Sequence, residues 1–335
     1  QYEWSPFIFL RFNNQSILLK ITLENGYELT VTKDHPLLDN NLNWKKADEL
    51  GLDEQLITAY DVPNITKNEI PLALARLLGF TISDGSLNQR IRHTKDSKGY
   101  NYLSNRQRYR YFSIEPELLG QVKEDIKQLF PQYTPKLNID KGKCPYIQVI
   151  SQEVCQTLNQ HQIPFGKKSD IVEIPKIILE SSNIIQREFI KALFSGDGTV
   201  SQHTYQIEYY SNSKKLLQQI SFLLHQEGIA CKIRKKMAKC NGKTFKSYRL
   251  YISGQENLLK FNYKIGFYSQ LKQQRMNNLL KRYKCNMKKL NQNHLAYKIT
   301  NIEEVYEPFV YDLTVPKNHN FIANGMISHN TGKTL

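Results

Sequence analysis

The chain has 335 residues, and its 46 basic against 31 acidic side chains give a formal net charge of +15. This length predicts two domains, and a strongly basic balance favours a polyanionic partner. No apolar run reaches the roughly 20 residues that span a bilayer, and the five cysteines contain no Cys-x-x-Cys pair. These features exclude a transmembrane anchor and a cysteine-rich zinc site, and we expect a cytoplasmic protein that binds no membrane.

The first predicted elements are two strands, at Ser16–Thr22 and Tyr27–Thr32. The second strand runs into a Thr-x-x-His sequence that ends at His35 and is followed by Pro36. One interpretation is a turn at the strand end that the proline closes. The other is a catalytic motif, and the residues at the far end of the chain favour it.

Two later segments carry the same pattern, an apolar helix that stops at Asp-Gly. They run from Leu74 to Ser86 and from Glu188 to Thr199. The glycine of each Asp-Gly is expected to provide a left-handed C-cap. Small residues at matching positions would let the two helices pack closely; these are Gly79 with Ala192 and Ser83 with Gly196.

Close packing of these helices would bring Asp84 and Asp197 side by side. Two adjacent carboxylates repel each other unless a divalent cation lies between them, and hard oxygen ligands suit Mg²⁺. We therefore predict an Mg²⁺ site at these two residues. The alternative is that each Asp-Gly only ends a helix and begins a turn, which is the usual meaning of a single copy.

Each helix is followed by a strand in which basic and aromatic residues alternate, at Arg106–Phe112 and at Ser247–Ile252. An alternation with period two places one set of side chains on a single face. Such a face suits DNA, where arginines read guanine edges and lysines meet phosphates, although a solvated basic face is the alternative. The predicted DNA-binding residues are Arg106, Arg108, Arg110, Lys232, Arg234, Lys235, Lys236 and Arg249.

Two Asp-Gly helices, each with a basic and aromatic segment after it, resemble the two halves of a LAGLIDADG homing endonuclease. The resemblance implies an α+β domain at 66–289 with half-domains at 66–170 and 171–289, acting as a pseudo-twofold monomer. It also implies site-specific cleavage of double-stranded DNA at a magnesium site formed by Asp84 and Asp197. There the metal would generate the nucleophile and stabilise the leaving oxygen.

Members of this family often place one lysine in each half to neutralise the transition state. The block that carries it is recognisable around Lys272 in the second half. In the first half, Gly166–Pro175 matches the block except that Val172 stands where a lysine is usual. Either Lys168 or Lys167 substitutes for it, or the nuclease nicks DNA, or it has become inactive.

The chain ends in His329-Asn330-Thr331 and four further residues, and this triplet has the chemistry of a splice junction. The Asn330 carboxamide can attack its own backbone carbonyl and close a succinimide, which breaks the next peptide bond. An imidazole assists by polarising the carbonyl or by protonating the leaving group. Before that step, the Thr331 hydroxyl would accept an acyl group from upstream.

The preceding segments Val310–Val315 and Asn318–Gly325 resemble the C-terminal splicing block of inteins, and Gly26–Leu38 resembles their second N-terminal block. The resemblance implies an all-β Hint fold, shared with hedgehog autoprocessing domains and formed by residues 1–65 and 290–330 around the nuclease. It also implies splicing roles, in which Thr32 and His35 activate the N-terminal scissile amide, Asp312 tunes the nucleophile, and His319 and His329 assist Asn330.

Residues Thr331–Leu335 would then be a remnant of the host protein. Their first four residues, Thr-Gly-Lys-Thr, resemble the end of a Walker A loop, so the expected flanking host is a P-loop ATPase. Inteins begin with a block that carries a Cys or Ser nucleophile, and we expect this block upstream of Gln1. The alternatives are an intein whose nuclease is degenerate, and a free-standing nuclease or RNA maturase, against which the terminal His-Asn-Thr argues.

Overall fold

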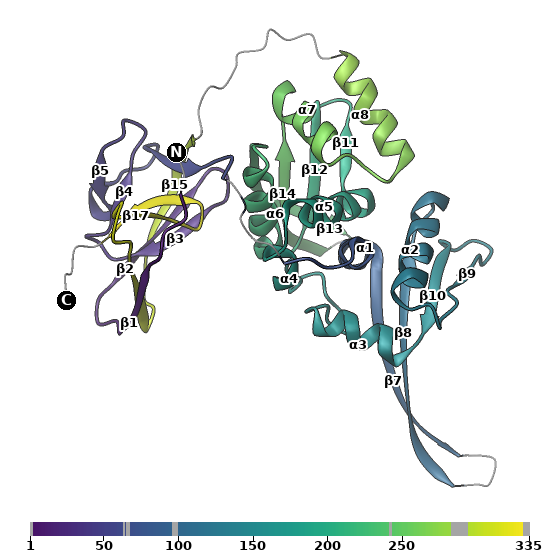
Figure 1. Ribbon diagram of the computed structural model, residues 1–335. Helices are drawn as coiled ribbons and strands as arrows, with labels where there is room; N and C mark the ends of the chain where they lie inside the picture. Colours follow the sequence, from purple (N-terminus) through teal and green to yellow (C-terminus); the bar gives the residue numbers. More distant parts are fainter. Residues whose placement is uncertain are drawn as a thin grey trace. The chain divides into compact units, whose positions relative to one another are not determined.

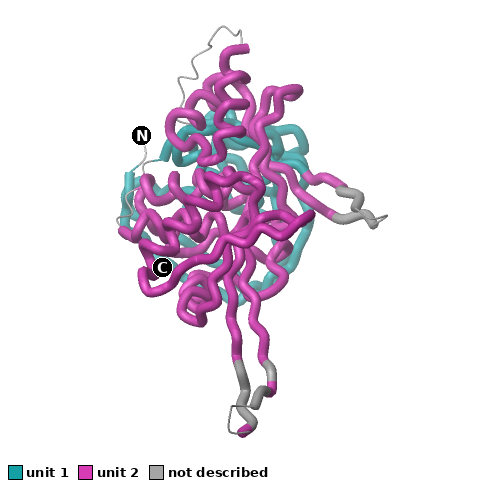
Figure 2. Tube along the Cα trace, turned by 90° about the vertical axis from the view of Figure 1, so that its right-hand side faces the viewer, with its two compact units in different colours: residues 1–63, 224–234, 288–335 teal, residues 64–223, 235–287 magenta. Residues whose placement is uncertain are grey.

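The computed structural model describes residues 3–62, 64, 68–95, 100–240, 243–282 and 294–330. The chain forms two compact units, coloured teal and magenta in Figure 2. Unit 1 contains residues 1–63, 224–234 and 288–335, and unit 2 contains residues 64–223 and 235–287. The grouping of 224–234 with unit 1 has no counterpart in the domain division predicted from the sequence. None of the described helices has both the length and the apolar character needed to cross a membrane.

Unit 1 is built from strands. Their bounds are β1 Ile8–Asn13, β2 Leu18–Leu23, β3 Glu28–Val31, β4 Pro36–Leu38, β5 Trp44–Lys46, β6 Gln55–Ala59, β15 His294–Val305, β16 Phe309–Thr314, β17 Asn320–Ala323 and β18 Met326–His329. The main sheet has the order β3-β2-β15-β6-β18-β4-β5 with β17 paired to β18, and β1 pairs with β16 in a separate two-stranded sheet. Strands from the two ends of the chain therefore alternate in one sheet. The strands predicted at 16–22, 27–32 and 310–314 are confirmed as β2, β3 and β16.

The core of unit 1 follows from the alternation of side chains along these strands. In β2, Leu19, Ile21 and Leu23 are buried on one face, while the residues between them are partly exposed. They pack in one cluster with Tyr297 from β15 and Met326 from β18. Burial of this cluster ties the N-terminal and C-terminal strands together.

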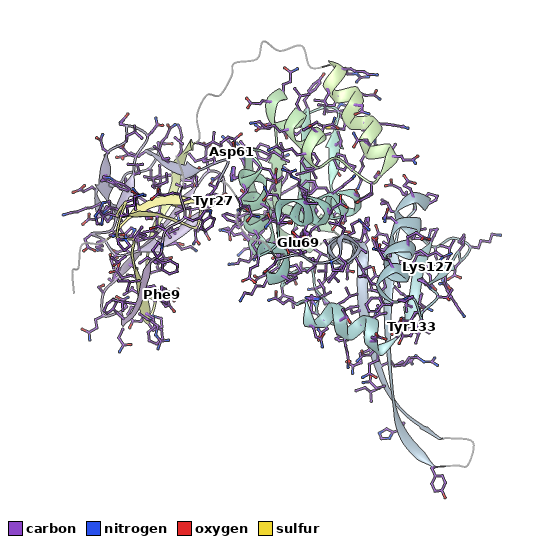
Figure 3. All side chains as sticks on the ribbon, in the orientation of Figure 1. Phe9, Tyr27, Asp61, Glu69, Lys127 and Tyr133 are labelled. Carbon is purple, nitrogen blue, oxygen red and sulfur yellow. The ribbon has the colours of Figure 1, made fainter. Side chains whose placement is uncertain are left out.

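Residues 224–234 complete this unit from a distant part of the sequence. His225 is 2 % exposed, its Nδ1 meets the hydroxyl of Tyr27, and its Nε2 lies 3.3 Å from the hydroxyl of Tyr297. Tyr27 is labelled in Figure 3, and so is Asp61, whose N–H donates to His225 O at 2.8 Å. Burial lowers the pKa of His225 to about 3, so the ring is neutral at physiological pH.

The pattern α-β-β-α-β-β-α occurs twice in the chain. The first copy is α1 Leu72–Asp84, β7 Gly85–Lys95, β8 Asn101–Phe112, α2 Pro116–Leu129, β9 Lys136–Asn138, β10 Tyr146–Ile150 and α3 Gln152–Gln160. The second copy is α5 Asn183–Asp197, β11 Thr199–Ser201, β12 Gln206–Ser211, α6 Lys214–Gln226, β13 Cys231–Cys240, β14 Lys243–Ile252 and α7 Gln255–Lys264. Both copies lie in unit 2 except for residues 224–234, which include the end of α6 and the start of β13. Helix α4 Lys176–Leu179 precedes the second copy, and α8 Gln270–Arg282 follows it. The sheet orders β7-β8-β10-β9 and β11-β12-β14-β13 match, which agrees with two related α+β halves.

Helices α1 and α5 pack against each other in the middle of unit 2 (Figure 1). A Cβ added at Gly79 would lie 2.5 Å from Phe189 O, and one added at Gly196 would lie 2.5 Å from Ser83 Cβ. Real Cβ contacts are longer than this, so both positions need glycine. The prediction that small residues let the two helices approach closely is confirmed.

The glycines that follow the two aspartates have a different role from the one predicted. Gly85 has φ −85° and Gly198 has φ −69°, so neither forms a left-handed cap, and that prediction is wrong. Each leads straight into a strand and passes close to the last helical turn. A Cβ at Gly85 would lie 2.5 Å from Thr81 Cα, and one at Gly198 would lie 2.5 Å from Phe194 O. Close backbone approach requires glycine at both positions.

Candidate active sites

Asn330 follows β18, and its side chain is held by the backbone of Val315. The Val315 N–H donates to Asn330 Oδ1 at 3.1 Å, and Asn330 Nδ2 donates to Val315 O at 3.1 Å. The Asn330 N–H donates to His319 O at 2.7 Å, and the residue is only 9 % exposed. The carboxamide is therefore held in one orientation and largely shielded from water, which favours reaction within the chain over hydrolysis.

Two imidazoles flank this asparagine. His329 Nδ1 lies 2.8 Å from the backbone oxygen of Asn330, and His319 Nδ1 lies 3.5 Å from Asn330 Nδ2. His319 has a left-handed backbone with φ 56°, a conformation that is uncommon outside glycine and concentrated at functional sites. The His329 ring packs edge-on against Trp44 at 4.9 Å between centroids, a contact that no sequence pattern predicted. One ring can thus polarise the carbonyl while the other receives a proton from the carboxamide.

Thr32, His35 and Asp312 line one cavity of about 630 Å³ in unit 1. The Thr-x-x-His sequence forms a turn in which the His35 N–H donates to Thr32 O at 3.1 Å. Burial lowers the pKa of His35 to about 4, against the opposing charges of Asp34 and Asp312, so the ring is neutral at physiological pH. Its Nε2 is buried and has no hydrogen-bond partner within the described residues, which leaves it available to a further peptide segment.

The cavity and the Asn330 site are neighbours in unit 1. Strand β18 pairs with β4 through Ser328 and Leu37, which places His329 close to the turn of His35. The charge of Asp312 raises the pKa of His35, and the charge of His329 lowers it. The structure thus brings together the predicted splicing residues that it describes, whereas Thr331 lies outside the described residues.

In unit 2, Asp84 and Asp197 are the last residues of α1 and α5. A Cβ at Gly196 would lie 2.9 Å from Asp84 Oδ2, so the first carboxylate touches the second helix. Burial raises the pKa of Asp84 to about 6; the charge of Asp197 adds to this increase, and Lys272 opposes it. Burial also raises the pKa of Asp197. A divalent cation would relieve both the burial of charge and the mutual repulsion.

A lysine from the same half lies beside the end of each Asp-Gly helix. Lys168 Nζ donates to Ser83 O at 3.1 Å and also to the carbonyls of Thr81 and Gly85. Lys272 Nζ donates to Ser195 O at 2.6 Å and also to the carbonyls of Phe194 and Gly196. These carbonyls carry the partial negative charge of a helix C-terminus. Burial lowers the pKa of Lys168 to about 8 and also lowers the pKa of Lys272.

Val172 is buried, and of the nearby lysines Lys168 is the one beside the end of α1. Val172 is 4 % exposed, and its N–H donates to Lys168 O at 2.9 Å within a turn. Lys167 is exposed and pairs with Asp170 at 2.5 Å. Of the two substitutes that the sequence left open, Lys168 lies where Lys272 lies in the other half, and Lys167 does not.

Two buried tyrosines beside the carboxylates were not predicted. The hydroxyl of Tyr209, which is 1 % exposed, donates to Asp197 Oδ2 at 3.3 Å. Tyr111 is fully buried, and its hydroxyl has no partner in the part of the chain that the structure describes. Burial raises the pKa of both phenols, and the charges of Asp84 and Asp197 add to this, so both stay protonated. Because their hairpins differ in length, the two tyrosines stand at different offsets from their aspartates, and no sequence repeat marks them.

The donor set of this site fits a hard divalent cation. Within the described residues, no group of three or more His, Cys, Asp or Glu is placed to hold a metal. The protein ligands that the described part of the chain offers at this site are thus limited to the two carboxylates of Asp84 and Asp197. Water and a substrate phosphate would complete the ligand shell. Mg²⁺ is commonly bound in this way, by one or two carboxylates with several retained waters.

The arginines of β8 form a basic face on which the like charges repel one another. Arg106, Arg108 and Arg110 lie at least partly exposed on its outer side, and the residues between them are buried, as the alternation predicted. Arg106 stands opposite Arg90 on β7. Partial burial lowers the pKa of Arg108, and the charges of Arg110, Arg90 and Arg106 lower it further. Like charges on adjacent strands destabilise a sheet, so a bound polyanion would stabilise this face.

The predicted basic residues of the second half differ in their surroundings. Lys232 pairs with Glu24 at 3.0 Å in unit 1, and Arg249 pairs with Glu208 at 3.3 Å. The side chains of residues 234–236 are exposed on β13. DNA contact by Lys232 or Arg249 would first have to break the ion pair that each of them makes.

Comparison with known proteins gives a family and several relatives. The family described as "Intein splicing domain" matches residues 7–330. A replication factor C small subunit of Thermococcus kodakarensis is 31% identical over 83% of this chain and 29% of its own length. A protein of the same name from Methanocaldococcus jannaschii is 30% identical over 79% of this chain and 13% of its own length. A DNA polymerase of Thermococcus litoralis is 23% identical over 98% of this chain and 20% of its own length.

Among solved structures, the homing endonuclease I-DmoI in complex with DNA and Mn superposes on part of the chain with a TM-score of 0.42 and 21% identity. The superposition covers 58% of this chain and 96% of that one. The chain spans less than a third of the curated relatives described above.

Proposed function

We propose that this chain excises itself from a host protein and that cyclisation of Asn330 releases it. The proposal starts from its family, because this chain belongs to the intein splicing family. The relatives support a transferable insert, because they carry different names and share only 13% to 29% of their length with this chain. The observation that carries the proposal is the arrangement at Asn330, a buried carboxamide between two imidazoles.

In the Asn330 step, Nδ2 attacks the backbone carbonyl carbon of the same residue. His329 Nδ1–H donates to the carbonyl oxygen and stabilises the developing negative charge, while His319 Nδ1 accepts the proton from Nδ2. The new C–N bond closes a succinimide, the bond from Asn330 to Thr331 breaks, and the proton passes to the new amine of Thr331. The atoms of the intact chain are thereby divided between two products without addition of water.

The cavity lined by Thr32, His35 and Asp312 is proposed to receive the N-terminal splice junction. A neutral His35 can donate its N–H to the nitrogen of the scissile amide, and Asp312 can orient the first nucleophile. That nucleophile is proposed to come from sequence upstream of Gln1. The host is proposed to be a P-loop ATPase whose phosphate-binding loop resumes at Thr331, and the name replication factor C small subunit among the relatives gives one candidate.

For unit 2 we propose site-specific, Mg²⁺-dependent cleavage of double-stranded DNA in the host gene that lacks the insert. Three features support this function: paired carboxylates at the meeting of two repeated halves, one lysine beside each, and the basic face of β8. Bound Mg²⁺ would supply an activated water and charge stabilisation. Asp84 and Asp197 would hold the cation, and Lys168 and Lys272 would neutralise the phosphate. Because one chain supplies both carboxylates, it is proposed to act as a monomer.

Incubation of a plasmid that carries the uninterrupted host sequence with the chain and Mg²⁺ tests the nuclease. We expect linear product from the natural chain and none from Asp84→Ala or Asp197→Ala. Cleavage that survives both substitutions would refute the metal site. Binding of the plasmid without cleavage would favour the alternative, a splicing element with a degenerate nuclease.

A further inference from the structure

Tyr111 and Tyr209 occupy matching places in the two halves of unit 2. In the β7–β8 hairpin, Tyr111 lies opposite Gly85, the residue that follows Asp84. In the β11–β12 hairpin, Thr199 pairs with Glu208, and this register places Tyr209 opposite Gly198, the residue that follows Asp197. Each phenol therefore approaches its aspartate from the first antiparallel pair of its own sheet.

The two hydroxyls differ in what they contact. Tyr209 donates to Asp197 Oδ2 at 3.3 Å. The Tyr111 hydroxyl is fully buried and has no hydrogen-bond partner in the described part of the chain. A buried hydroxyl without a partner is destabilising, and such groups are retained mainly where a bound ion, a water or a substrate completes them. Of the charged groups around Tyr111, Asp84 acts on it most strongly.

We propose that Tyr111 and Tyr209 are a matched pair of positioning residues, each donating a hydrogen bond to the carboxylate of its own half so that the carboxylate presents a fixed oxygen to the cation. Tyr209 makes this bond to Asp197 in the structure, and Tyr111 makes it to Asp84 when the cation is bound. Hydrogen bonds to a metal-ligating carboxylate orient it and strengthen metal binding. The inference rests on the proposed metal site of the nuclease.

Neighbouring Tyr109 provides a matched control. It lies on the same strand and the same face, and it is also fully buried, but its hydroxyl accepts a hydrogen bond from Thr81 Oγ1 at 3.3 Å. Asp125, rather than Asp84 or Asp197, is the carboxylate that affects its pKa. Tyr109→Phe therefore removes an equally buried hydroxyl from β8 without reaching the metal site.

The test is binding of Mn²⁺ to the full chain, followed through the electron paramagnetic resonance signal of the free ion. We expect Tyr111→Phe and Tyr209→Phe each to weaken binding about tenfold, the effect of one hydrogen bond to a charged group. Tyr109→Phe should change the affinity less than about twofold, since it leaves the carboxylates untouched. Urea unfolding without metal adds a second readout. There Tyr111→Phe should be at least as stable as the natural chain, because the buried hydroxyl that it removes has no partner in that state.

The possible outcomes separate this inference from the function on which it rests. The positioning role alone would be overturned if Tyr111→Phe and Tyr209→Phe both bound Mn²⁺ as tightly as the natural chain. In that case Asp84→Asn and Asp197→Asn would still have lost Mn²⁺ affinity. Absence of Mn²⁺ binding by the natural chain would overturn the metal site and the inference together. Unfolding of Tyr111→Phe in the absence of metal would mean that the hydroxyl is structural, which also overturns the proposal.

Discussion

Replacing Gly79 by alanine tests how closely α1 and α5 must pack to bring the two aspartates together. The new methyl group would stand 2.5 Å from Phe189 O and 3.0 Å from Ala192 Cβ. Rotation of a side chain cannot relieve a contact with a backbone oxygen, so one helix must move. Overpacking of this kind costs about 1–3 kcal/mol, and the better helix propensity of alanine returns only about 1 kcal/mol. We expect a net loss of about 1 kcal/mol, and at most about 2 kcal/mol, in the free energy of unfolding of unit 2.

Gly120→Ala is the matched control, because Gly120 is also inside a helix and a Cβ there would meet nothing within 4 Å. It should gain about 1 kcal/mol from helix propensity alone. Far-UV circular dichroism during urea unfolding follows the α-helices, and those that the structure describes lie in unit 2 except for the end of α6. Trp4 and Trp44 report on unit 1. If Gly79→Ala proves as stable as Gly120→Ala, the tight contact between α1 and α5 is refuted.

Three further predictions concern charge. The pKa of Asp84 is raised to about 6, so its ionised form destabilises the folded state above that pH. Asp84→Asn should therefore raise the free energy of unfolding of unit 2 at neutral pH by about 1–3 kcal/mol in urea. Lys168→Met should slow cleavage of a labelled duplex at least about tenfold, and Lys167→Met should leave the rate unchanged. The pKa of His225 is lowered to about 3, so between about pH 6.5 and pH 3 the imidazole binds a proton in the unfolded chain but not in the folded one. Unit 1 should lose about 1.4 kcal/mol per pH unit there, and His225→Gln should flatten this dependence of tryptophan-monitored unfolding.

Local periodicity was sufficient to predict several features of this chain. The two Asp-Gly helices end where their sequences indicate, and Arg106, Arg108 and Arg110 share a face because side chains alternate along a strand. The Thr-x-x-His turn and the Asn330 junction likewise depend on residues that are close in the sequence. The error at Gly85 arose because Asp-Gly at a helix end has two physical explanations, a positive φ and a close backbone approach, and the sequence is the same for both.

Features that depend on tertiary contact could not be predicted. Lys168 reaches the end of α1 through a turn that also buries Val172, and neither residue type reveals this. His225 is a core group of unit 1 only because Tyr27 and Tyr297, which are far away in the sequence, enclose it. These contacts are set by the packing of distant segments, on which sequence spacing gives no information.

Mass spectrometry of the purified chain after incubation at neutral pH tests the splicing chemistry most directly. Cyclisation of Asn330 predicts a product of residues 1–330 that ends in a succinimide, together with the peptide Thr331–Leu335, and the two masses sum to that of the intact chain. Asn330→Ala should remain whole. Two results would contradict the role assigned to Asn330, because each would show that hydrolysis cleaves this bond. One is a first-formed 1–330 product that is one water heavier than the succinimide, and the other is equal release of the peptide from Asn330→Ala.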